Sequence, residues 1–174
     1  MICVIACTNR PNSNSLKISE YYIKLLQQLE VSCTLIDLNK LPERYLFSAL
    51  YHNQGKDEIF NSIKTEIAKA EKFIFVVPEY NGSFPGVLKA FIDGLDYPTS
   101  FKNKKAALIG ISSGVMGGSL ALSHLTDILN YLGMHVLASK PRITRIEKTF
   151  IDGEINDALV KELISIQVKD FLNF

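Results

Sequence analysis

The stretch "KFIFVVPEYNGSFPGVLKAFIDGL", residues 72–95, contains the transition on which the fold prediction depends. After Lys72 its first part, 72–77, is continuously apolar, which is typical of a buried β-strand. From residue 86 onward, apolar side chains recur at helical spacing and predict a helix over 86–97. The loop 78–86 between them is longer than the about two to six residues that such a connection needs. We therefore expect this loop to do more than join a strand to a helix.

Apolar strands and amphipathic helices alternate along the rest of the chain. Further strands are predicted over 2–7, 31–38, 105–112 and 135–141, and further helices over 14–29, 57–70, 118–133 and 154–172. Segment 39–56 is irregular, with a short apolar patch at 45–51. Continuously apolar strands separated by helices predict a parallel sheet with helices on both faces, and right-handed crossovers favour the open, doubly wound form. No linker or repeat interrupts the pattern, so residues 1–174 are predicted to form a single α/β domain.

The composition argues against several classes of protein. With 47% hydrophobic residues, 21% charged residues and a net charge of +1, the 174-residue chain is globular and has no basic cluster for nucleic acid. No apolar run reaches the about 18 residues of a membrane span, and the first residues read as a strand rather than a signal peptide. Three cysteines without a C-x-x-C pair favour buried thiols in a reducing compartment, and hence the cytoplasm. The histidines lack metal-ligand spacing, so no metal site is expected.

Ligands of open parallel sheets bind beyond the carboxyl ends of the strands, so the loops at that edge are the candidate site. The most polar and glycine-rich connections follow the first, third and fourth predicted strands. They are "TNRPNSNS" (8–15), "PEYNGSFPG" (78–86) and "SSGVMGG" (112–118).

The first of these loops has the side chains of an anion site at the start of a helix. Its polar residues are Thr8, Arg10, Asn12, Ser13, Asn14 and Ser15. A helix N-terminus offers free N–H groups and a partial positive charge, and a guanidinium group fits a phosphate. The alternative is that the serines and asparagines only cap the helix. The loop has neither G-x-G-x-x-G nor G-x-x-x-x-G-K-[ST], which argues against a dinucleotide on this strand and against a P-loop.

The other two loops differ in how far folding alone explains them. In the second, Gly82 suits a turn, Ser83 suits a cap and Pro85 suits the first helical position. Folding does not explain the tip of that loop, which consists of Glu79, Tyr80 and Asn81. In the third, three glycines within 114–118 either let the backbone approach a planar ligand or merely make the turn flexible.

The stretch "PEYNGSFPGVLKAFIDGLD", 78–96, preceded by its apolar strand, resembles the signature of the NADPH-dependent FMN reductase family, which includes flavin, quinone, azo-dye and chromate reductases. The first loop is similar to that family's phosphate loop, usually written G-S-x-R-x-x-S-x-N, and the third loop to its third flavin loop. The resemblance covers residues 2 to about 140. It implies a flavodoxin-like sheet of order 2-1-3-4-5, bound FMN, NADPH or NADH as co-substrate, a small-molecule electron acceptor, and a homodimer or dimer of dimers.

The resemblance also assigns residues to the cofactor, and it leaves the chemistry to the flavin rather than to a catalytic side chain. The phosphate positions correspond to Thr8, Arg10, Ser13, Asn14 and Ser15. The loop along the isoalloxazine ring corresponds to Pro78, Glu79, Tyr80, Asn81 and Gly82, and the loop at its other edge to Ser112, Ser113 and Gly114. Cys7-Thr8 stands where the family usually has Gly-Ser, and Ser15 where it has Asn, so the departures concern the phosphate contacts of Thr8 and Ser15.

Three functions follow from this reading. The preferred one is an enzyme, an FMN-dependent NAD(P)H oxidoreductase that reduces a quinone, flavin or similar acceptor. A flavodoxin-type electron carrier is the alternative, but carriers have strongly acidic surfaces, whereas this chain has Arg10 in its loop, no Trp and a net charge of +1. A flavin-free scaffold would follow if Cys7 and Ser15 had abolished the phosphate site.

The helix predicted after Pro85 carries apolar residues on more than one face, namely Val87, Leu88, Phe91, Ile92 and Leu95. A helix that only covers a sheet needs one apolar stripe, so the wider surface predicts a subunit contact, with Phe91 and Leu95 as outward positions. The alternative is that the segment 45–51 covers the second face.

Overall fold

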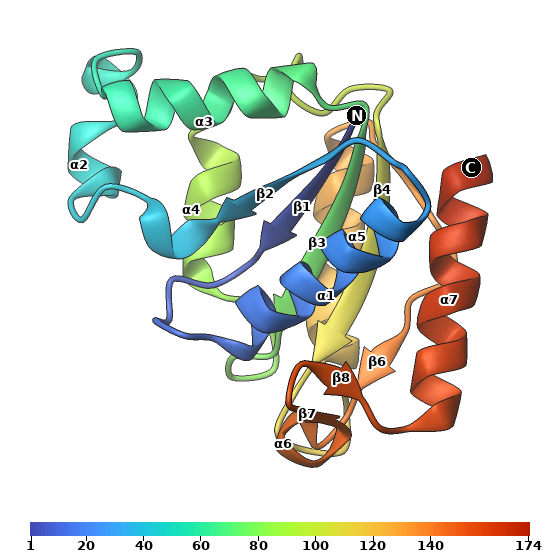
Figure 1. Cartoon of the computed structure of the whole chain (residues 1–174). Helices are drawn as coiled ribbons and strands as arrows, with labels where there is room; N and C mark the ends of the chain where they lie inside the picture. The colour runs from blue at the N-terminus through green and yellow to red at the C-terminus, as the bar shows by residue number, and fades with distance from the viewer.

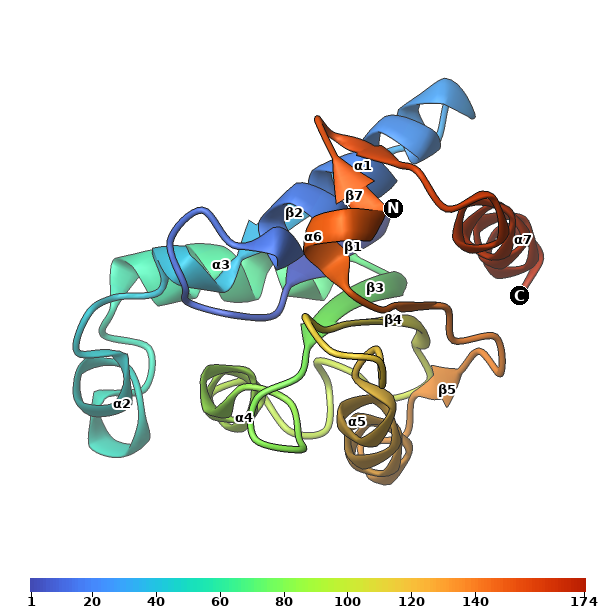
Figure 2. The same cartoon turned by 90° about the horizontal axis from the view of Figure 1, so that it is seen from below.

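The computed structural model describes all 174 residues and contains a parallel sheet. Its strands are β1 (Ile2–Ala6), β2 (Cys33–Asp37), β3 (Lys72–Pro78), β4 (Lys105–Ile111), β5 (His135–Val136) and β6 (Arg142–Ile143). The order is β2-β1-β3-β4-β5, β6 also pairs with β4, and every pairing is parallel. The predicted sheet order is therefore confirmed. Because all pairings are parallel, the carboxyl ends lie at one edge; β1, β4 and β6 point toward the lower part of Figure 1, the side from which Figure 2 is seen.

Helices cover both faces of the sheet (Figures 1 and 2). One face packs against α1 (Asn14–Gln28) and α7 (Ala158–Asn173), and the other against α3 (Glu58–Lys69), α4 (Gly86–Asp93) and α5 (Ser119–Tyr131). Successive strand residues point to opposite faces, so Val4 lies in the α1/α7 core while Cys3 and Ile5 lie in the other. No helix combines the length and the apolarity that crossing a membrane requires.

The fifth strand departs from the prediction over 135–141. It stops at Val136, and the chain leaves β4 until Arg142 starts β6. Pro141 has no amide hydrogen to continue a strand ladder. The gap leaves the Leu108 carbonyl without a strand partner, and the fully buried Gln167 donates to it at 2.8 Å. The same side chain donates to the Ser139 carbonyl at 3.0 Å and accepts from the Tyr22 hydroxyl at 2.7 Å.

We therefore expect Gln167→Met to lower the free energy of unfolding by at least about 2 kcal/mol, because it leaves buried polar groups unpaired. Urea unfolding of the variant and of the unmutated protein measures the difference. Gln27→Met is the matched control, since Gln27 is exposed on α1 and its side chain makes no hydrogen bond. Equal stabilities of the two variants would show that the Gln167 network contributes nothing.

The closing helix begins at Ala158 rather than at residue 154. Before it, the chain forms α6 (Ile146–Thr149) and a hairpin of β7 (Phe150–Ile151) and β8 (Glu154–Ile155). Asp152 and Gly153 make the hairpin turn with φ of 53° and 83°, the Asp-Gly combination typical of a type I′ turn. The carboxylate of Asp157 then caps α7 by accepting from the Val160 amide at 3.0 Å.

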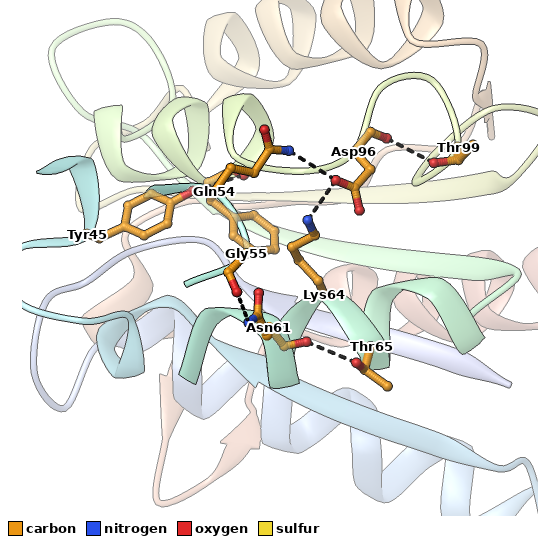
Figure 3. Close-up of polar contacts among 9 residues, drawn as sticks. Tyr45, Gln54, Gly55, Asn61, Lys64, Thr65, Asp96 and Thr99 are labelled. Atoms are coloured by element: carbon orange, nitrogen blue, oxygen red, sulfur yellow. Dashed lines mark hydrogen bonds and ion pairs between the residues drawn. The ribbon is translucent and has the colours of Figure 1, made fainter. Parts of the chain in front are cut away.

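The irregular segment 39–56 folds back onto α4. It contains two single-turn 3-10 helices, Leu38–Lys40 and Tyr51–Asn53, and between them α2 (Tyr45–Ser48). The buried Tyr45 donates its hydroxyl to the Ala90 carbonyl at 2.9 Å, and its ring lies 4.8 Å from that of Phe60. Figure 3 shows Gln54 and Lys64 both reaching the Asp96 carboxylate, at 3.2 Å and 2.6 Å. The contacts of Tyr45 and Gln54 hold the segment against α4 and the residues that follow it, and Lys64 ties α3 to the same place.

This packing corrects the prediction about the helix after Pro85. Phe91 and Leu95 are buried within the chain, so they are not outward positions for a partner subunit. Tyr45 of the segment 45–51 reaches the Phe91 carbonyl at 3.5 Å, and the Phe60 ring of α3 lies 6.3 Å from the Phe91 ring, so that segment covers part of the helix, as the alternative held. The helix also ends at Asp93 instead of continuing to residue 97, with Gly94 as its C-cap. A Cβ at Gly94 would collide with the Tyr45 hydroxyl, so close packing requires glycine there.

Candidate functional site

A cavity lies where the three predicted loops meet at the carboxyl edge of the sheet. The predicted residues that line it are Thr8, Arg10, Ser13, Asn14, Ser15, Pro78, Glu79, Tyr80, Ser112 and Ser113. Asn81, Gly82 and Gly114 belong to the same loops but do not line the cavity. Asn12, named above among the polar residues of the first loop, also lines it, whereas the remaining lining residues Ile111, Ile146 and Glu147 were not predicted. Figure 2 shows the loop after β1, the loop before α4 and the helix α6 around this edge.

The first loop both caps α1 and leaves polar groups free. Ser13 is the N-cap residue, and its hydroxyl accepts from the Leu16 amide at 3.1 Å. The amides of the first helical residues have no acceptor within the helix. Ser15 is 1% exposed, and its hydroxyl is the one buried side-chain polar atom without a hydrogen-bond partner. A buried hydroxyl left unpaired costs about 1–3 kcal/mol, so this position fits a ligand oxygen.

Tyr80 joins the first loop to the second. Its hydroxyl lies 2.7 Å from Oγ1 of Thr8, and the guanidinium carbon of Arg10 lies 5.5 Å from the centre of its ring. Arg10 makes no ion pair, and its backbone amide donates to the Thr8 hydroxyl at 3.3 Å. Arg10 thus lines the cavity with its charge available, held in place by stacking on an aromatic ring.

The second loop is a closed β-turn rather than a loose connection. Tyr80 and Ser83 exchange backbone hydrogen bonds of 2.7 Å and 3.0 Å, and Asn81 and Gly82 between them have φ of 50° and 77°. Two positive φ values define a type I′ turn, for which Asn-Gly is the preferred pair. The Glu79 carboxylate accepts from the Gly82 amide at 2.8 Å and fixes the turn further.

Ser83 does not cap α4 as predicted, because the N-cap position is Pro85. The Ser83 hydroxyl instead lies 2.9 Å from Nδ1 of His124 on α5. The sequence contains no signal for this contact, since the two residues are 41 positions apart and no motif joins them.

The third loop uses its glycines for backbone geometry. Gly117 and Gly118 have φ of 58° and 75°, which favours glycine. The Ser112 hydroxyl accepts from the Gly117 amide at 2.9 Å and donates to the Gly114 carbonyl at 3.0 Å. Loop closure therefore accounts for Gly117 and Gly118, while Gly114 has a negative φ and open space around it.

The segment after β6 adds a wall that sequence reasoning missed. The amides of Arg145 and Ile146 donate to the carbonyls of Gly114 and Ser112 at 2.9 Å and 3.0 Å, which fastens α6 to the third loop. Ile146 and the exposed Glu147 then line the cavity. Only the fold brings residues this far along the chain next to the loop after β4.

Two cysteines of the first strand segment, Cys3 and Cys7, are buried thiols. Burial raises the pKa of Cys3 to about 12 and raises the pKa of Cys7 as well, so both stay protonated at neutral pH. The Cys7 thiol donates to the Ile5 carbonyl at 3.3 Å. No group of three or more His, Cys, Asp or Glu side chains is arranged to hold a metal ion.

The profile of a family described as NADPH-dependent FMN reductase matches residues 1–144. The chain belongs to the NADPH-dependent FMN reductase family. An NAD(P)H-dependent FMN reductase of Pseudomonas aeruginosa is 31% identical over 168 residues, covering 90% of this chain and 89% of the relative. A 2-hydroxy-1,4-benzoquinone reductase of a Burkholderia species is 32% identical over 130 residues, which cover 73% of this chain and 69% of the relative.

Solved structures agree with this assignment. The flavoenzyme NAD(P)H:(acceptor) oxidoreductase of Paracoccus denitrificans has a TM-score of 0.76 and 26% identity, with 99% of this chain and 96% of that chain covered. An archaeal flavodoxin has a TM-score of 0.63 at 14% identity, with 97% of this chain and 95% of that chain covered. At this identity the likeness shows the flavodoxin-like fold alone. FMN is thus the cofactor of the family to which the chain belongs, and NAD(P)H its co-substrate.

The residues present fit FMN. The unpaired Ser15 hydroxyl, the free amides at the start of α1 and the charge of Arg10 suit a phosphate monoester. Ser15 stands where the family usually has Asn, and its hydroxyl is still available to bind the phosphate of FMN.

We expect Ser15→Ala to affect affinity and stability in opposite ways. The FMN dissociation constant should rise about tenfold or more, because a hydrogen bond to a charged oxygen is lost. The flavin-free protein should be as stable as before or more stable, because an unpaired buried hydroxyl is removed. Fluorescence titration with FMN and urea unfolding measure the two quantities.

Ser19→Ala is the control, since the buried Ser19 hydroxyl already donates to the Ser15 carbonyl at 2.8 Å and does not line the cavity. Unchanged FMN affinity in Ser15→Ala would remove Ser15 from the phosphate site.

Proposed function

We propose that this chain is an FMN-dependent NAD(P)H oxidoreductase that passes reducing equivalents from NADPH or NADH to a quinone, flavin or similar small acceptor. The family match over residues 1–144 carries the proposal. The relatives named as an FMN reductase and as a benzoquinone reductase support the class of acceptor.

The first loop has the role of holding the phosphate. Ser13, Asn14 and Ser15 supply backbone amides at the start of α1, and Ser15 also supplies its hydroxyl. Arg10 supplies the charge. Thr8 acts through Tyr80, because its hydroxyl is already engaged with the tyrosine at 2.7 Å.

The second and third loops have the role of holding the isoalloxazine ring. Pro78, Glu79 and Tyr80 line one side, and the Asn81-Gly82 turn just outside the cavity holds them in place. Ser112, Ser113 and Gly114 form the opposite edge, closed by the Ser112 hydrogen bonds. When bound, FMN supplies the hydride and electron chemistry, so the proposal assigns no acid or base to the protein.

Apolar side chains at the tip of the third loop serve to exclude water. Val115 and Met116 are exposed although they are apolar, and they follow directly after Ser112–Gly114. Apolar side chains at this position can pack over a bound planar co-substrate and keep water away from it.

We also propose a cytoplasmic homodimer or dimer of dimers. The buried Phe91 and Leu95 are unavailable for the subunit contact, so the exposed Phe47 and Tyr51 of the segment that covers α4 are better candidates. Free cysteines without a disulfide support a reducing compartment.

The purified protein, reconstituted with FMN, is expected to show flavin absorption and to oxidise many equivalents of NADPH or NADH when benzoquinone is present. Absorbance at the nicotinamide band follows the turnover. Oxidation of one equivalent without further turnover would indicate an electron carrier instead. A colourless protein that takes up no FMN would contradict both functions and leave the flavin-free scaffold.

We expect Arg10→Ala to raise the FMN dissociation constant about ten- to hundredfold, because the variant loses a charge-assisted hydrogen bond to the phosphate. The dissociation constant of Arg10→Lys should lie between that of the unmutated protein and that of Arg10→Ala. Lysine keeps the positive charge but loses the planar group that lies over the Tyr80 ring. Lys17→Ala removes the same charge from the exposed side of α1 and should leave affinity unchanged. If Arg10→Ala and Lys17→Ala bind FMN equally well, Arg10 is not a phosphate ligand.

A further inference from the structure

A second polar cavity lies between α5 and the chain that joins β5 to β6. Its volume is about 360 Å³, and one side consists of Ser119, Ser123, Thr126 and Asp127 on α5. Lys140 and Arg142 form the opposite side. Figure 2 shows α5 and β5 side by side, with this connection leaving β5.

The cavity holds two cations that no carboxylate neutralises. The ion pairs of the structure are Lys64–Asp96, Lys69–Glu66 and Lys89–Asp93, so Lys140 and Arg142 take part in none. Asp127 is the one carboxylate in the lining, and it pairs with neither. Lys140 is half-buried, and burial lowers the pKa of its ammonium group. An anion between the two side chains would relieve this cost.

Backbone geometry places both cations on the same side. Lys140 and Arg142 flank the buried Pro141, whose carbonyl accepts from the Gly110 amide at 3.0 Å. In an extended chain, residues two positions apart point to the same side. Because Pro141 is fixed against β4, its neighbours Lys140 and Arg142 both lie at the cavity.

The α5 side of the cavity offers hydrogen-bond donors. Ser119 and Ser123 are one helical turn apart, and neither hydroxyl has a partner within the protein. The Thr126 hydroxyl donates to the Leu122 carbonyl at 2.7 Å and is not free. Ser119 is the first residue of α5; its amide donates to the Met116 carbonyl at 3.2 Å, and the cap residue Gly118 has no side chain to accept from the amides that follow. Two cations, two hydroxyls and a helix start together suit a dianionic phosphate monoester.

The cavity adjoins the third loop of the proposed flavin site. Ser119 follows directly after the third loop, and a Cβ at Gly117 of that loop would lie 2.7 Å from Cβ of Arg142. A nicotinamide dinucleotide is an extended molecule whose adenosine end lies far from its reactive ring. NADPH differs from NADH only in a phosphate on that adenosine.

We infer that this cavity, lined by Ser119, Ser123, Lys140 and Arg142, binds the 2′-phosphate of NADPH and makes the enzyme prefer NADPH to NADH. The inference rests on the proposed function and deepens it by naming the co-substrate and the residues that select it.

The test compares the unmutated FMN-loaded protein with the double variant Lys140→Ala/Arg142→Ala. Calorimetry measures binding of adenosine 2′,5′-bisphosphate, which has the 2′-phosphate but no nicotinamide, and of adenosine 5′-phosphate, which lacks it. The double variant should bind the bisphosphate at least about tenfold more weakly and the monophosphate within twofold as before. Asp127→Asn should tighten binding of the bisphosphate, because it removes the opposing charge.

Kinetics supply a second readout. The KM for NADPH should rise at least about tenfold in the double variant, while kcat and the KM for NADH stay within twofold. The control variant Lys161→Ala/Lys169→Ala removes the same net charge from exposed positions on α7. It should leave kcat and the KM for both nucleotides unchanged.

Three results would overturn the inference. One is equal binding of the two adenosine probes by the unmutated protein. Another is an equal loss for NADPH and NADH, or the same loss in the α7 control. The third is displacement of the bisphosphate by inorganic phosphate at equal concentration, which would show a general anion site. Oxidation of neither nucleotide would refute the proposed function instead, and the adenosine probes would still decide the inference on the cavity.

Discussion

Burial of both faces of a parallel sheet is the constraint on which the rest of this structure depends. Successive residues of β1 alternate between two apolar cores, with Val4 in one and Cys3 and Ile5 in the other. Strands of this kind have no solvent-facing side on which polar chemistry can be placed. Functional groups are therefore confined to the loops, and parallel strands bring those loops together at the carboxyl edge. The candidate cofactor site is a direct consequence.

Each loop at that edge is closed by its own hydrogen bonds, so the site is rigid without depending on a ligand. Ser13 caps α1, the Asn81-Gly82 turn is held by Tyr80 and Ser83, and Ser112 fastens the third loop. Against this background the unpaired Ser15 hydroxyl is informative, because the other buried side-chain polar atoms have a partner. A site whose donors are already oriented loses less entropy when it binds a cofactor.

The break in the fifth strand has consequences on both sides of the sheet. On one side Gln167 of α7 takes over the hydrogen bond that the strand would have made to Leu108. On the other, the departing chain carries Lys140 and Arg142 to the cavity beside α5. The chain then returns as β6 and continues into α6, which closes the cofactor cavity. One interruption thus adds a buried polar network, a cationic cavity and a wall of the site.

The sequence by itself determined the class of fold, most element positions and the three loops that form the site. These are predictable because apolar periodicity and turn chemistry are local, and each motif of the family pattern lies within one short stretch, the most specific being 78–96. Tertiary structure decided that Phe91 and Leu95 are buried, because the helix that carries Phe91 packs against Tyr45 and Phe60, far away in the chain. It also decided the contacts of His124, Glu147 and Lys140, which depend on which elements the crossovers bring side by side. Such contacts are set by packing between distant segments, and a local pattern contains no record of them.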